Sequence, residues 1–187
     1  MVAVEAGNQA GSASLPAPSS TFRPRLRTAA AAWLELTLPV LTGHGDLGPS
    51  SCLLGDGRIR VIDWEGGVGT RTPTADLVIF LTHYVRAQPT HRNRLPDHED
   101  AFRAALLDDG WLASLTGATF RAQLGRLGVP PEAEEYLFVA ALAELACGQA
   151  RTAHGLAQRY WARLLAIYAA GHERSWLGEV SRRPPPG

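Results

Sequence analysis

The stretch that decides the fold is HGDLGPSSCLLGDGRIRVIDWE, which spans residues 44–65. Within it, residues 52–54 are apolar, and the Gly-Asp-Gly that follows is a turn sequence that tolerates positive φ. Arginine and apolar residues then alternate. This pattern predicts a β-hairpin over residues 52–63, with Ile59 and Val61 on its buried face and the two alternating arginines toward solvent.

One aspartate stands before this hairpin and another at its end. Asp46 lies in the loop before the first strand, and Asp63 follows the second strand. A rigid hairpin would therefore hold both carboxylates at its open end, where the two strands begin and finish. Two carboxylates at one site favour a cation between them. Phosphoryl transfer uses such a pair: one carboxylate accepts the proton of the attacking hydroxyl, and the other holds a metal ion on the phosphates. The arrangement therefore favours that chemistry.

With these residues, the chain resembles the aminoglycoside phosphotransferase and choline kinase-like family, whose fold is related to that of protein kinases. The match covers residues 25–85 by motif. In that family a His-Gly-Asp loop supplies the catalytic aspartate, and an Ile-Asp-Trp/Phe-Glu segment supplies a metal-binding aspartate. The resemblance implies a catalytic role for Asp46 and a magnesium-ligand role for Asp63. It gives supporting roles to His44, which would brace the loop from behind, and to Asp76, which would tie the next helix to the loop backbone.

Position 51 departs from the family pattern, which has a metal-binding Asn five residues after the catalytic aspartate. Ser51 offers one hydroxyl oxygen with a shorter reach than an Asn carbonyl, so we expect a weakened second metal site. The resemblance implies Mg²⁺ with ATP or another nucleotide as cofactors, held through Asp63 and Ser51. It also implies a small molecule with a hydroxyl group as the substrate that accepts the γ-phosphoryl group.

The expected fold class is mainly α-helical with one small β-hairpin, the C-terminal lobe of a protein-kinase-like fold. Apolar spacing and proline positions predict helices over residues 25–38, 75–84, 98–107, 119–127, 131–147 and 155–171. We expect Thr74 to cap the second of these helices and residues 66–73 to form a loop. Three regions follow from composition: a disordered tail over 1–24, the lobe over 25–178, and a disordered Pro-rich tail over 179–187.

The sequence contains no lysine, because all 18 basic residues are arginine. Complete members of the resembled family carry a β-rich N-terminal lobe with a lysine that pairs with the nucleotide phosphates. We therefore expect a catalytic lobe that lacks this nucleotide-binding lobe and is inactive as an isolated chain. A separate nucleotide-binding lobe is the partner that the resemblance implies, and the surface left for it would be apolar.

Composition excludes several classes of function. The formal net charge is zero, which argues against binding of nucleic acid or of anionic membranes through bulk electrostatics. The two cysteines lack metal-ligand spacing and are too few for a disulfide framework, which favours a reducing, cytoplasmic setting. The sequence shows neither an apolar run long enough for a membrane span nor a signal peptide.

Two alternatives to a phosphotransferase remain open. A degenerate or truncated kinase-like module with a binding or regulatory role is favoured by the missing lysine. A metal-dependent hydrolase could use His44, Asp46, Asp63 and Glu65, but the sequence lacks further His-rich ligand spacing. The substrate and the nucleotide cannot be read from the sequence, because such folds select substrates through variable helices and loops, here within residues 86–177.

Overall fold

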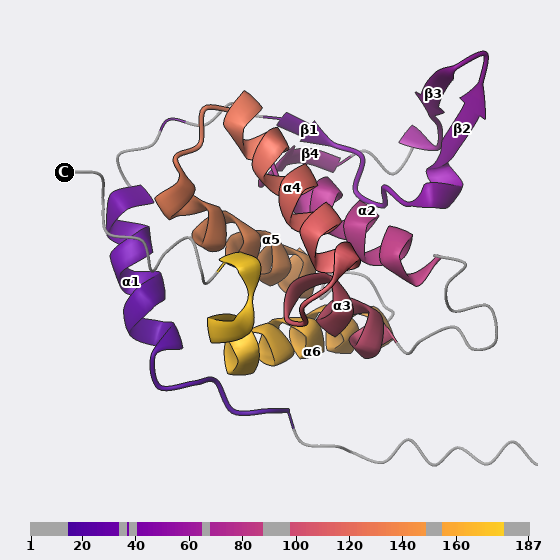
Figure 1. Cartoon of the computed structure of the whole chain (residues 1–187). Coiled ribbons are helices and arrows are strands. Elements are labelled where there is room, and N and C mark those ends of the chain that lie inside the picture. Colours follow the sequence, from indigo (N-terminus) through magenta and orange to yellow (C-terminus); the bar gives the residue numbers. More distant parts are fainter. Residues whose placement is uncertain are drawn as a thin grey trace, which may run out of the picture.

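The computed structural model describes residues 15–33, 37, 41–64, 68–87, 98–148 and 155–177. These residues are mainly helical, as the sequence predicts, and Figure 1 shows how the helices gather into one body. The helices are α1 (Phe22–Trp33), α2 (Ala75–Arg86), α3 (His98–Leu106), α4 (Trp111–Arg126), α5 (Glu134–Gly148) and α6 (Gly155–Gly171). Short 3₁₀ turns lie at Pro49–Ser51 (η1), Pro131–Ala133 (η4) and His172–Arg174 (η6).

Helix α5 is the central element of the core and contacts α1, α2 and α6. Phe138, Ala141, Leu142 and Leu145 are buried at helical spacing, as the sequence predicts, and Leu137 and Val139 are buried beside them. The ring of Phe138 packs against the rings of Phe102, Phe120 and Tyr168, so side chains from α3, α4 and α6 meet on α5. This core holds α2 in place at the edge that faces the strands.

A buried polar network attaches α1 to this core. The carboxylate of Glu135 accepts a hydrogen bond from the Tyr168 hydroxyl at 3.0 Å and pairs with Arg25 at 2.9 Å. Burial raises the pKa of Tyr168 well above its ordinary value, so the hydroxyl stays protonated and acts as the donor. Helix α1 begins at Phe22, and the backbone N–H of Ser19 donates to α6, so the described structure starts before the expected boundary at residue 24.

The strands form two separate antiparallel pairs. The predicted hairpin is confirmed: β2 (Cys52–Gly55) pairs with β3 (Arg58–Val61) across a two-residue turn. A second pair, β1 (Leu41–Gly43) with β4 (Val68–Arg71), was not expected, because we predicted a loop over residues 66–73. These strands are short and lie far apart in the sequence, so no local alternation announces their pairing.

The hairpin is more exposed than its alternation predicts. It projects away from the helices in Figure 1, and the prediction of a buried face was wrong at Ile59, whose side chain is 70% exposed. Leu54, its cross-strand partner, is 81% exposed. Val61, near the base, is half-buried. Alternation specifies which residues share a face of a sheet, but a second element must cover that face before it is buried.

Three further expectations can be compared with the structure. Helix α4 begins at Trp111, eight residues before the predicted start, because its buried face includes small and polar residues that weaken the apolar pattern. Thr74 does not cap α2: its hydroxyl donates to the carbonyl oxygen of Leu137 in α5 at 3.2 Å. Residues 1–14, 34–36 and 178–187 lie outside the described residues. Among the helices described, none combines the length and apolarity that crossing a membrane requires.

Candidate functional site

The loop that carries Asp46 is held by the first turn of α2. The carboxylate of Asp76 accepts the backbone N–H of His44 at 2.5 Å and that of Gly45 at 2.9 Å. These are the contacts expected of Asp76. Gly45 has a φ of 89°, a conformation that favours glycine. It turns the chain away from β1 immediately after the two hydrogen bonds to Asp76.

His44 connects the two segments that carry the predicted aspartates. Its ring is buried, and its Nδ1 accepts the backbone N–H of Asp46 at 3.4 Å. Its Nε2 lies 2.7 Å from the carbonyl oxygen of Ile62, so this nitrogen carries the proton and donates it. Both ring nitrogens thus bind backbone groups. These contacts are the kind that a loop-bracing histidine makes, and they occupy both ring nitrogens.

Asp63 follows Ile62 directly. The imidazole of His44 therefore links the backbone of Asp46 to the residue that precedes Asp63. The backbone of Asp63 is left-handed, with a φ of 62°, which Asp tolerates better than most residues. The ring of Trp64, on its other side, lies 5.1 Å from the His44 ring. The side chains of Asp46 and Asp63 are both exposed to solvent, so both carboxylates are accessible.

Ser51 has a structural contact that the sequence did not indicate. Its side chain is buried, and its hydroxyl donates to the carbonyl oxygen of Asp46 at 3.3 Å. Its backbone N–H donates to Gly48 at 3.0 Å, and its carbonyl oxygen accepts the N–H of Ile62 at 2.9 Å. Ser51 therefore closes the loop and joins it to the end of β3.

The described residues contain no group of three or more His, Cys, Asp or Glu side chains able to hold a metal. Glu65, which the hydrolase alternative requires, lies outside them. Magnesium is commonly held by one or two carboxylates together with substrate phosphates rather than by an all-protein cage. Any fit of this loop to Mg²⁺ would therefore depend on phosphate oxygens supplied by a nucleotide, and the ligand role of Asp63 stays a prediction.

The structure adds one residue that the sequence analysis did not single out. His83 of α2 lies beside the loop, and its Nδ1 would be 3.1 Å from a Cβ atom built at Gly48. His83 follows Asp76 by seven residues, which places both on one face of the helix. That spacing is the signal in the sequence that could have identified it.

The chain matches no protein-family model, no curated protein and no solved structure. Its function is therefore argued from this site.

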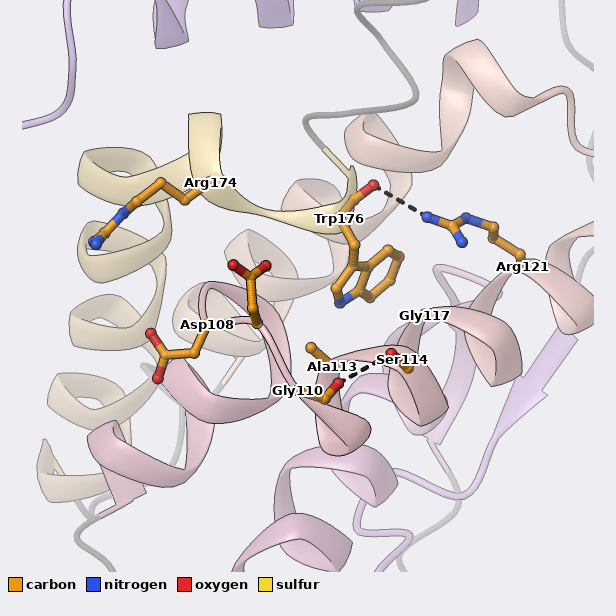
Figure 2. A pocket seen from close by; sticks show the side chains of 9 residues that line it. Asp108, Gly110, Ala113, Ser114, Gly117, Arg121, Arg174 and Trp176 are labelled. Carbon is orange, nitrogen blue, oxygen red and sulfur yellow. Dashed lines mark hydrogen bonds between the residues drawn. The ribbon is translucent and has the colours of Figure 1, made fainter.

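A separate cavity of about 300 Å³ lies between the α3–α4 connection, α4 and the η6 region (Figure 2). Arg121 donates to the carbonyl oxygen of Trp176 at 3.1 Å, and the indole packs closely over Gly117. The lining residues are Asp108, Asp109, Gly110, Ala113, Ser114, Gly117, Arg121, Arg174 and Trp176. This cavity contains none of the predicted site residues, so it is not part of the Asp46 loop.

Proposed function

We propose that this chain is the catalytic lobe of a phosphotransferase of the aminoglycoside phosphotransferase and choline kinase-like family. The reaction would transfer the γ-phosphoryl group of a nucleotide to a hydroxyl of a small molecule. The observation that carries this proposal is the bridge through His44, which holds the backbone of Asp46 and the residue before Asp63 on one imidazole. Two exposed carboxylates carried on backbone segments that are held together are what this chemistry needs.

Asp46 would accept the proton of the attacking hydroxyl. Its carboxylate is exposed, whereas its backbone is fixed by the N–H contact with His44 and by the hydroxyl of Ser51 on its carbonyl oxygen. A base on a fixed backbone can orient a hydroxyl for in-line attack without further reorganisation.

Asp63 would hold the metal that accompanies the nucleotide. Mg²⁺, when bound with the phosphates, neutralises charge that develops on the transferred group. The backbone of Asp63 is left-handed, and its neighbours Ile62 and Trp64 both contact the ring of His44. Ser51 would contribute less, because its side chain is buried and its hydroxyl is already bound to the carbonyl oxygen of Asp46.

A separate lobe that binds the nucleotide would complete the enzyme. The sequence has no lysine to pair with phosphates. The exposed cross-strand pair Leu54 and Ile59 of the β2–β3 hairpin offers an apolar surface on which such a lobe could pack. We accordingly expect the isolated chain to show no turnover.

The second candidate function is that of a non-catalytic binding or regulatory module descended from such a phosphotransferase. The contact of the Ser51 hydroxyl with Asp46 favours it, because a residue expected at the metal serves the loop instead. Phosphotransfer with a nucleotide-binding lobe supplied distinguishes the two. The enzyme requires turnover that Asp46→Asn abolishes, and Ser51→Asn should raise that turnover at limiting Mg²⁺ by about 10-fold or more, the usual scale of such metal contacts. If the folded chain shows no turnover with the nucleotide-binding lobe supplied, the result would support the non-catalytic module.

Binding can be tested on the chain alone with Mn²⁺ and ATP, since Mn²⁺ replaces Mg²⁺ and broadens nearby NMR signals. We expect broadening of the amide signals of Asp46 and Asp63 that needs both Mn²⁺ and ATP and is lost in Asp63→Asn. Asp56→Asn is the matched control, because Asp56 is an exposed hairpin aspartate with a similar φ of 52°. Equal broadening in the two variants, or broadening centred elsewhere, would contradict the proposed site.

A further inference from the structure

Helix α2 contacts the Asp46 loop at two points. Asp76, in its first turn, accepts the N–H groups of His44 and Gly45. His83 lies seven residues later, about 10 Å further along the same face of the helix, and stands against Gly48. The loop therefore runs alongside α2 between these two residues, and Asp46 lies between the two contacts.

The space around Gly48, and not its backbone conformation, is what disfavours a larger residue at this position. Its φ of −125° and ψ of 172° are extended, a conformation open to any residue. A Cβ atom there would lie 3.1 Å from Nδ1 and 3.9 Å from Cγ of His83. Gly48 is also buried, so an added Cβ would require the imidazole or the loop to move by a few tenths of an ångström. The two residues are fitted to each other.

The position of Gly48 is transmitted to Asp46 through Ser51. The carbonyl oxygen of Gly48 accepts the N–H of Ser51, and the Ser51 hydroxyl donates to the carbonyl oxygen of Asp46. A displacement of Gly48 must therefore lengthen or bend one of these two hydrogen bonds. We infer that His83 is a positioning residue that sets the path of the loop and hence the placement of Asp46. This inference rests on the proposed function only for the role of Asp46 as the base.

A double-mutant cycle tests this coupling. Gly48→Ala should shift the amide NMR signals of Asp46 and Ser51 and lower the Tm by about 2–12 °C, because overpacking costs about 1–3 kcal/mol and each kcal/mol lowers the Tm by about 2–4 °C in a chain of this size. Adding His83→Ala should return the Asp46 signal toward its native position and recover most of the lost Tm, because the alanine frees the space. Gly55→Ala is the matched glycine control, since Gly55 also lies outside the helices and a Cβ at position 55 meets nothing within 4 Å.

His83→Ala alone covers the case in which Gly48→Ala does not fold, because it only removes atoms. Signal shifts concentrated in residues 46–51 would support the inference. Unchanged Asp46 and Ser51 signals, or strictly additive effects in the double variant, would overturn it. The cycle needs no nucleotide. Coupling in a protein that shows no turnover with the nucleotide-binding lobe supplied would therefore refute the proposed function alone, and turnover without coupling would refute only the role of His83.

Discussion

Replacing Asp76 with alanine tests whether this one carboxylate holds the candidate site. The variant removes the acceptor of two backbone N–H groups, those of His44 and Gly45. A hydrogen bond to a charged group contributes about 1.5–3 kcal/mol. Because Asp76 is only half-buried, water can replace part of the loss. We therefore expect the free energy of unfolding to fall by about 2–4 kcal/mol, below the full sum of two such bonds.

Urea denaturation followed by circular dichroism measures the global loss, and hydrogen exchange measures the local one. The amides of His44 and Gly45 should lose protection in Asp76→Ala. Asp76→Asn keeps one acceptor oxygen but turns an NH₂ group toward the second N–H, so about half of the loss should remain. Asp100→Ala is the matched control: Asp100 is an exposed acid in the first turn of α3, and its loss should cost only about 0.3–1 kcal/mol. If Asp76→Ala costs no more than this control, or if both amides stay protected, the reasoning is wrong.

Two further predictions concern the core and the cavity. Burial raises the pKa of Glu134, with Arg121 opposing the shift. The folded state therefore holds this proton more tightly than the unfolded state, and the resulting stability is present at acidic pH and lost as the pH rises above the ordinary Glu range. Glu134→Gln should thus unfold at higher urea than the native chain at pH 7, and the difference should disappear near pH 4; a constant difference would contradict the assignment. Gly117→Ala places a Cβ 3.1 Å from the Trp176 ring and should cost about 1–3 kcal/mol, measured by thermal unfolding, whereas an unchanged Tm would show that the ring moves freely aside.

The helical part of the fold was predictable because its signals are local. The helices that begin at Ala75, His98 and Gly155 start where they were predicted, since apolar spacing and turn residues mark them within the segment itself. The β1–β4 pair was not predictable in this way, because its strands gain their hydrogen bonds from residues far away in the sequence. The start of α4 was missed for a related reason: small residues such as Gly117 fit against Trp176, and only the fold brings that partner near.

The residues of the candidate site were chosen from the sequence, and only part of their contacts could be expected from it. The sequence indicated Asp46, Asp63, His44 and Asp76, and the contacts expected of the last two are present. The buried hydroxyl contact of Ser51 was not foreseen, because it depends on how the loop closes. The roles of the two aspartates and of the metal stay predictions.

The exposed hairpin has a consequence for the behaviour of the protein in salt solutions. Arg58 and Arg60 lie on the same β2–β3 hairpin as the exposed side chains of Leu54 and Ile59. At low ionic strength the guanidinium groups of two copies repel each other, whereas at about 1 M salt this repulsion is screened beyond roughly 3 Å. The attraction between apolar side chains is not screened. We therefore expect self-association to increase with salt concentration, the reverse of a charge-driven assembly, and Leu54→Lys to suppress it in sedimentation velocity experiments.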